Sequence, residues 1–183
     1  QQSFFSLCMS FDFAQDEANI CPEDGSIIQP FFFERKHMSI QLTIIGLGQI
    51  GASIGLALSE KKSTLQRVGH DKNPEAAREA QKKGAVDKIM FNLPASVEEA
   101  KIVLLCLPVS EVIPTLEVIA QDLPEGAVVM DTALAKRETF LWVEERMPAG
   151  RFYVGLYPSI RMEYLHNAST GLEAAKADLF KDS

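Results

Sequence analysis

From residue 41 onward, short apolar runs alternate with longer segments in which apolar residues recur every three or four positions. The apolar runs cover residues 41–46, 66–71, 87–91, 101–108, 126–131 and 151–156, and helical periodicity covers 49–62, 73–84, 110–123 and 136–147. The runs are typical of strands and the periodic segments of helices. Because strands that alternate with helices form βαβ units, the pattern predicts an α/β fold with a doubly wound, mostly parallel sheet and helices on both faces.

Two of the predicted helices carry further local signals. In the second helix, Asn73 is placed as the N-cap, Pro74 at the first helical position and Gly84 at the C-terminal stop. The first helix has apolar residues at the spacing of one helix face, namely Ile50, Ile54, Ala57 and Leu58. These signals support the alternation of strands and helices independently of the apolar runs.

Three glycines follow the first predicted strand and open the first helix, as Gly46-x-Gly48-x-x-Gly51. In a dinucleotide site the first glycine makes the tight turn, the second lets the pyrophosphate approach the backbone, and the third lets the helix pack on the sheet. A glycine-rich turn without a ligand is the alternative. An acid at the end of the second strand would hold the adenosine ribose, and Asp71 lies there, 20 residues after Gly51. Together these features predict a Rossmann-type fold that binds a dinucleotide.

Asp71 favours NAD as the cofactor, because a carboxylate accepts a hydrogen bond from the ribose 2′-hydroxyl and repels a 2′-phosphate. Lys72 follows directly, and its charge is compatible with NADP as well, or it is a solvated loop residue. NAD is therefore the expected cofactor, with NADP as the alternative.

Residues 1–37 differ from the rest of the chain, because they contain aromatic clusters and show no sustained periodicity. They lack the basic region and the small-residue cleavage site of a signal peptide. Met38 directly precedes the first patterned strand. We expect residues 1–37 to be a poorly ordered extension and residues 38–183 to form the dinucleotide-binding domain; an arm packed on the domain is the alternative.

Composition and charge narrow the class of protein. The chain has 183 residues, 46% of them hydrophobic, and a net charge of −7 with scattered basic residues. Nucleic-acid surfaces need clustered Lys and Arg, and a membrane span needs roughly 20 consecutive apolar residues, so neither partner is expected. The cysteines Cys8, Cys21 and Cys106 have neither metal-ligand spacing nor a disulfide framework. We expect a cytoplasmic protein with a small-molecule substrate and no metal.

Five stretches resemble a known family in order along the chain: IIGLGQIGASIGLAL, VGHDKNPEAAREAQKKGAVD, AKIVLLCLPVSEV, GAVVMDTALAK and GLEAAKADLF. They are similar to the nucleotide-binding domain of prephenate dehydrogenase, a family that includes arogenate dehydrogenases. The resemblance implies oxidative decarboxylation of prephenate or arogenate with NAD(P), in tyrosine biosynthesis. It also implies a helical second domain that closes the substrate pocket and forms a homodimer. The sequence to Ser183 does not include that domain, so we expect this chain alone to be inactive.

The resemblance assigns cofactor-binding roles by position. It places the pyrophosphate on the glycine motif, the ribose at the acid after the second strand, and the cofactor above the turn after the fourth strand. A plain strand-to-helix turn is the alternative for Leu107 and Val109. The residues implied are Gly46, Gly48, Gln49, Ile50, Gly51, Asp71, Leu107, Pro108 and Val109, with Ser53 at a position where the family often has serine.

The chain departs from the family at its catalytic positions. The stretch DTALAK has Leu134 where the family usually has serine, and GLYP has Tyr157 where the family has the histidine that contacts the substrate hydroxyl. Tyrosine, with a reference pKa of about 10, is a poor base near pH 7 but still a hydrogen-bond partner. His166 and Arg161 lie in a longer connection and are further candidates, or solvated loop residues. We take Tyr157 and His166 as the catalytic candidates.

Three functions therefore stay open. The first is the cofactor domain of a divergent prephenate or arogenate dehydrogenase. The second is another NAD(P)-dependent reductase with the same domain plan, acting on an imine or a 2-hydroxy acid. The third is an NAD-binding sensor that has lost catalysis, which Leu134 and Tyr157 would suit.

Overall fold

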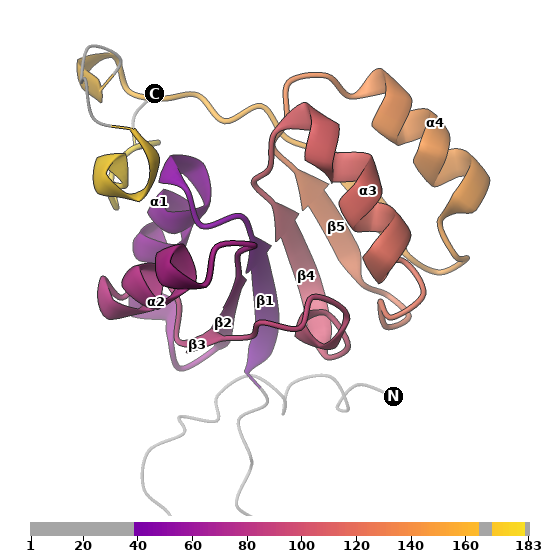
Figure 1. The fold of residues 1–183 in the computed structure, drawn as a ribbon, viewed down its shortest axis with the longest axis horizontal. Helices are drawn as coiled ribbons and strands as arrows, with labels where there is room; N and C mark the ends of the chain where they lie inside the picture. Colours follow the sequence, from indigo (N-terminus) through magenta and orange to yellow (C-terminus); the bar gives the residue numbers. More distant parts are fainter. Residues whose placement is uncertain (1–38, 165–169, 182–183) are drawn as a thin grey trace, which may run out of the picture. The chain divides into compact units, whose positions relative to one another are not determined.

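The computed structural model describes residues 39–164 and 170–181, in which six parallel strands form one sheet (Figure 1). The expected extension at residues 1–37 and the candidate His166 lie outside the described residues. The sheet has the order β3-β2-β1-β4-β5-β6, the strand order of a Rossmann fold. The strands are β1 (Ile40–Ile45), β2 (Leu65–His70), β3 (Lys88–Ile89), β4 (Ala100–Leu105), β5 (Val128–Asp131) and β6 (Phe152–Gly155).

Helices cover both faces of the sheet, as the sequence pattern predicted. Figure 1 shows α1 (Gln49–Ala57) and α2 (Pro74–Lys82) on one face, and α3 (Val109–Ile119) and α4 (Arg137–Arg146) on the other. Each face has its own hydrophobic core. Leu42, Ile44 and Leu104 pack on the α1–α2 side, whereas Val103 and Leu105 pack on the α3–α4 side. Since neighbouring residues of β4 point to opposite faces, a continuous apolar run is what this strand requires.

The first helix differs from its prediction in length and in its buried face. It ends at Ala57, and a 3₁₀ turn at Ser59–Lys61 leads the chain back toward β2. The buried residues of α1 are small, with Ala52, Ser53 and Gly55 among them, whereas Ala57 is exposed. The reason is close packing: a Cβ at Gly55 would lie 2.2 Å from the carbonyl oxygen of Ala85. The larger apolar residues Ile54, Leu56 and Leu58 are therefore only partly buried where they pack against the core on this side of the sheet.

The predicted ends of α2 are confirmed. The side-chain oxygen of Asn73 accepts a hydrogen bond from the Glu75 amide at 3.0 Å, and Pro74 is the first helical residue. Gly84 follows the C-cap with φ +80°, the left-handed conformation in which glycine ends a helix at little cost. Among the described residues, no helix is long and apolar enough to cross a bilayer.

Arg67 is a fully buried cation in β2 that ties several elements together. Its guanidinium forms two bonds with the Asp87 carboxylate, at 2.6 and 3.0 Å. Its Nη1 donates to the carbonyl oxygens of Gly55, Gly84 and Ala85. Burial raises the pKa of Asp87, but hydrogen bonds and charge from Arg67 outweigh burial, so the pKa lies below its usual value. The ion pair therefore joins β2 to the end of α1 and to the loop before β3.

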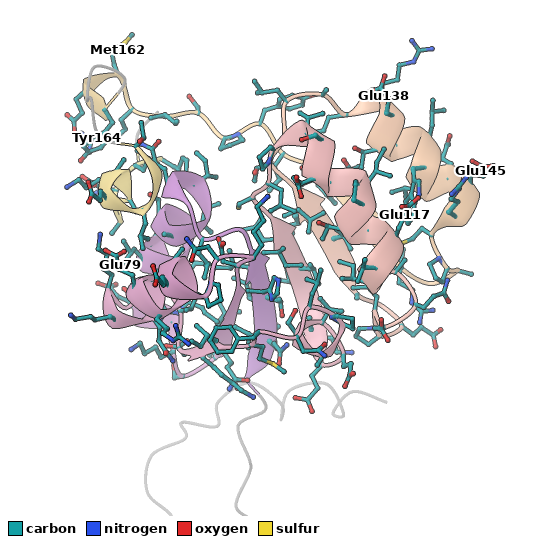
Figure 2. The ribbon with its side chains drawn as sticks, viewed as in Figure 1. Glu79, Glu117, Glu138, Glu145, Met162 and Tyr164 are labelled. Atoms are coloured by element: carbon teal, nitrogen blue, oxygen red, sulfur yellow. The ribbon has the colours of Figure 1, made fainter. Side chains whose placement is uncertain are left out.

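The chain after β6 returns to the α1 side of the sheet, where Figure 1 shows it in yellow. The Lys176 amide donates to the hydroxyl of Ser53 at 2.9 Å, and Leu179 is fully buried. Asp178 accepts hydrogen bonds from Arg161 and from Tyr164, which is labelled in Figure 2. The hydrogen bond between Lys176 and Ser53 therefore attaches the C-terminal segment to α1, whereas Arg161 and Tyr164 bond Asp178 within that segment.

Candidate cofactor-binding site

A pocket of about 350 Å³ lies at the carboxyl ends of the central strands. The chain leaves β1 toward β2 and leaves β4 toward β5, so the strand order reverses here. Ligands of open α/β sheets bind at such a point. The pocket is lined by Ile45, Gly46, Gly48, His70, Asp71, Lys72, Leu93, Cys106, Leu107, Pro108, Glu111 and Thr115.

The three glycines of the motif have three different surroundings. Gly46 has φ +92°, and a Cβ there would lie 2.4 Å from the Cys106 carbonyl oxygen. A Cβ at Gly51 would lie 2.0 Å from the carbonyl oxygen of Gly46. A Cβ at Gly48 would meet no heavy atom of the described residues within 4 Å, apart from its chain neighbours. Gly46 and Gly51 are therefore required by the fold, whereas Gly48 leaves open space at the pocket wall.

The first turn of α1 supplies hydrogen-bond donors next to that open space. Gly48 is the N-cap of the helix and offers no side-chain cap. The first amides of a helix have no acceptor within it, and the helix dipole places positive charge at this end. The amides of Gln49, Ile50 and Gly51 belong to this turn. Open space beside free donors fits a pyrophosphate.

Asp71 holds the glycine loop as well as facing the pocket. One carboxylate oxygen accepts a hydrogen bond from the Leu47 amide at 2.8 Å, and the other accepts from the Asn73 amide at 2.8 Å. Each carboxylate oxygen has a second lone pair, so both can accept another hydrogen bond. Asp71 can therefore bind ribose hydroxyls while it fixes the position of the glycine loop.

Two titratable residues of the pocket, His70 and Glu111, were not singled out from the sequence. His70, at the end of β2, is only 9% exposed and places Nδ1 2.9 Å from the carbonyl oxygen of Met90. Glu111, in the first turn of α3, forms an ion pair with Lys72 at 3.5 Å. Both additions depend on packing between elements distant in sequence, so no local signal marks them.

A second pocket, of about 370 Å³, continues along the same edge between β4 and β5. It shares three residues with the first pocket, so the two are neighbours. Its wall includes Cys106, whose pKa is raised to about 12 by burial and by the charge of Asp131 despite a hydrogen bond with Thr132. The thiol is thus protonated and unreactive at neutral pH. The lining residues are Ile50, Cys106, Leu107, Pro108, Val109, Thr132, Ala133 and Leu134.

A buried ion pair lies where β5 and β6 end. Asp131 is fully buried, and its carboxylate meets Lys136 at 3.1 Å and the hydroxyl of Tyr153 at 3.0 Å. Lys136 also donates to the Asp131 carbonyl, at 2.6 Å, and its Nζ lies 5.4 Å from the ring centre of Tyr157. Burial and the Asp131 carboxylate both raise the pKa of Tyr153. This cluster fixes Lys136 beside Tyr157.

The structure brings together most of the predicted cofactor residues. The first pocket is lined by Gly46, Gly48, Asp71, Leu107 and Pro108 of the predicted set, and the second by Ile50 and Val109. Gln49 and Gly51 line neither of these two pockets, and Gly51 is buried.

The two described positions at which the chain departs from the family, Tyr157 and Leu134, lie outside the first pocket. Tyr157 is 67% exposed beside Lys136 and lines neither of the two pockets. Leu134, at the position where the family has serine, lines the second pocket and is 78% exposed. Within residues 39–164 and 170–181, no group of His, Cys, Asp and Glu could hold a metal ion.

Comparisons with known proteins agree with this geometry. Residues 54–183 match the model of the family described as prephenate dehydrogenase, nucleotide-binding domain. The chain is 30% identical over 145 residues to a prephenate dehydrogenase of Lactococcus lactis, a match that covers 78% of this chain and 39% of that protein. It is 28% identical over 149 residues to the prephenate dehydrogenase of Bacillus subtilis, covering 81% and 39%.

A solved structure shares the fold. The prephenate dehydrogenase from A. aeolicus, in complex with hydroxyphenyl propionate and NAD⁺, superposes with a TM-score of 0.66 and 23% identity over 78% of this chain and 48% of that one. The chain thus spans only 39% of the length of the two curated relatives.

Proposed function

Because the chain belongs to the family of prephenate dehydrogenase nucleotide-binding domains, we propose that it is the NAD-binding part of an enzyme that oxidatively decarboxylates prephenate or arogenate in tyrosine biosynthesis. The two curated relatives are named prephenate dehydrogenase and support this reaction class. Each relative is longer than the match, which leaves room for the helical domain that the resemblance implies. Formation of a homodimer through such a domain, and a location in the cytoplasm, belong to the same proposal.

The observation that carries the proposal is the open space at Gly48, next to the first amides of α1 and in the same pocket as Asp71, which bonds the neighbouring Leu47 amide. The amides of Gln49, Ile50 and Gly51 would hold the pyrophosphate, and Asp71 would accept from the ribose hydroxyls. The turn of Leu107, Pro108 and Val109 would then lie under the cofactor. The neighbouring pocket, which reaches Leu134, would take the nicotinamide end.

The chain's part in the reaction is to bind, orient and exclude water. When bound, NAD would supply the acceptor for the hydride of the ring carbon that carries the hydroxyl, and loss of the ring carboxylate as CO₂ would leave its bonding electrons to complete the aromatic ring. Leu107, Pro108 and Leu134 give the second pocket an apolar wall beside that step. Tyr157 would form a hydrogen bond with the substrate hydroxyl from the carboxyl edge of β6, and His166 is the alternative partner.

We propose NAD rather than NADP because of the charges in the first pocket. Lys72 is the cation nearest Asp71 in sequence, but it is paired with Glu111 from the opposite wall. Asp71 and Glu111 together carry more negative charge than Lys72 can balance. This net negative charge would repel the 2′-phosphate of NADP, whereas the 2′-hydroxyl of NAD would donate a hydrogen bond to Asp71.

Glu111→Gln is expected to improve NADP binding by about fivefold, or ~1 kcal/mol, because it removes one carboxylate and frees Lys72. NAD affinity should stay within about twofold. Calorimetry with both cofactors measures the two changes. Glu117→Gln is the matched control, since Glu117 is also in α3 but points toward α4 and pairs with Arg146 at 3.6 Å (Figure 2). Equal NADP affinity in wild type, Glu111→Gln and Glu117→Gln would contradict this charge argument.

Tyr157→Phe is expected to lower turnover in the whole protein by on the order of 10²-fold, as for one lost transition-state hydrogen bond. NAD affinity should not change, and phenylalanine keeps a ring beside Lys136. Tyr164→Phe is the control, because Tyr164 bonds Asp178 away from the two pockets. A wild-type rate for Tyr157→Phe together with a loss in His166→Ala would move the role to His166.

The proposed activity is tested by NADH formation from prephenate and from arogenate in the longer protein of which this chain would be the NAD-binding part. Turnover of either compound supports the dehydrogenase. Turnover only of an imine or a 2-hydroxy acid would support a different reductase of the same plan. NAD binding without turnover of any of these compounds would support a sensor that has lost catalysis.

A further inference from the structure

His70 is a buried polar residue in the first pocket that the proposed reaction does not use. It ends β2, directly before Asp71, and is 9% exposed. His70 lines the pocket together with apolar residues that include Ile45, Leu93 and Leu107. A buried imidazole at a pocket wall needs a partner for each ring nitrogen, because an unpaired buried polar atom is costly.

The hydrogen bond at Nδ1 fixes the tautomer of the neutral ring. Nδ1 lies 2.9 Å from the Met90 carbonyl oxygen. A carbonyl oxygen only accepts hydrogen bonds, so Nδ1 carries the hydrogen and Nε2 carries a lone pair. Among the described residues, the only side-chain nitrogen or oxygen that is fully enclosed without a partner is Trp142 Nε1. Nε2 is therefore not sealed inside the protein, and because His70 lines the pocket, we infer that Nε2 faces its opening.

Few groups of a bound dinucleotide remain as hydrogen-bond partners for Nε2 of His70, because the other polar residues of the pocket suit other groups. Asp71 stands next to His70 and suits the ribose hydroxyls, with spare lone pairs on both oxygens. Lys72 and Glu111 are paired with each other. The apolar wall suits a flat base, and the donor that an adenine ring carries is its exocyclic amine.

We propose that Nε2 of His70 accepts a hydrogen bond from the exocyclic amine of the cofactor's adenine, and that His70 thereby selects adenine. The inference rests on the proposed function, because it needs a dinucleotide in this pocket. A base with a carbonyl at the same position, such as hypoxanthine, places an acceptor against the lone pair of Nε2. The tautomer cannot change without losing the hydrogen bond to Met90.

The test compares NAD with nicotinamide hypoxanthine dinucleotide, in which a carbonyl replaces the amine, by calorimetry on the purified 183-residue chain. Wild type is expected to bind NAD on the order of tenfold more tightly than the hypoxanthine analogue. His70→Phe keeps an aromatic ring and removes the acceptor, so the two affinities should become equal. His70→Asn is the second variant, because its amide can still donate to Met90 while no acceptor remains at the Nε2 position.

Thr115→Val changes another polar residue that lines the pocket and should keep the wild-type preference for NAD over the hypoxanthine analogue. Thermal unfolding of each variant checks that the chain is folded, and His70→Asn serves if His70→Phe is not. The proposal is wrong if both His70 variants keep the tenfold preference, or if the preference disappears in Thr115→Val instead. The absence of NAD binding in folded wild type would overturn the proposed function rather than this inference alone.

Discussion

Gly48→Ala is expected to weaken NAD binding by on the order of 10²-fold while the unfolding temperature stays within about 3 °C of wild type. The open space at Gly48 accepts the methyl group, and its φ of −76° suits alanine. The methyl group would stand between the pyrophosphate and the α1 amides, whose charge-assisted hydrogen bonds contribute about 1.5–3 kcal/mol each. Calorimetry and thermal unfolding measure the two quantities separately.

Gly51→Ala is the matched comparison within the same motif. Its methyl group would lie 2.0 Å from the carbonyl oxygen of Gly46, so the helix has to move away from the loop. We expect this variant to lose stability by about 1–3 kcal/mol, as in other overpacked sites, and to lose NAD binding with it. The account of the glycine motif would be contradicted if Gly48→Ala bound NAD like wild type, or if Gly51→Ala were as stable as wild type.

Arg67→Met is expected to reduce the free energy of unfolding by about 3–5 kcal/mol. The substitution leaves the Asp87 carboxylate without its guanidinium, and three carbonyl oxygens lose a donor. Urea unfolding at pH 7 measures the loss. Asp87→Asn in the same chain should restore part of it, because it removes the uncompensated charge.

The pH dependence of this contribution has a defined sign. The pKa of Asp87 in the folded protein lies below the ordinary value of 3.8. The stabilisation from the Arg67–Asp87 ion pair is therefore complete above about pH 3.8 and is lost as the pH falls through the lowered pKa of Asp87 in the folded state. Arg146→Met is the control, since Arg146 forms ion pairs on the surface with Glu117 and Glu145, both labelled in Figure 2. If Arg146→Met reduced the free energy of unfolding as much as Arg67→Met does, the role assigned to the burial of Arg67 would be contradicted.

The sequence predicted the fold because its signals are local. Apolar runs and helical spacing located each strand and each α-helix to within about five residues, and Asn73, Pro74 and Gly84 marked the ends of α2. The buried face of α1 could not be predicted in this way. Its position depends on how closely Gly51 and Gly55 approach the carbonyl oxygens of Gly46 and Ala85, one of which belongs to a distant segment.

The candidate site was predictable where one βαβ unit contains it. The glycine motif and Asp71 belong to β1, α1 and β2, and their positions follow from that unit. His70 and Glu111 were missed because their roles depend on contacts with Met90 in the loop after β3 and with Lys72 across the pocket. The contact between the Lys136 ammonium and the Tyr157 ring likewise requires β5 and β6 to be neighbours in the sheet.

The central claim, that this chain binds NAD at the Gly48 pocket, is tested most directly by calorimetric titration of the purified chain with NAD and NADP. The account predicts saturable binding of one NAD per chain, weaker binding of NADP, and loss of the NAD signal in Gly48→Ala. Circular dichroism confirms that each sample is folded. A folded wild-type chain that binds neither cofactor would contradict the account.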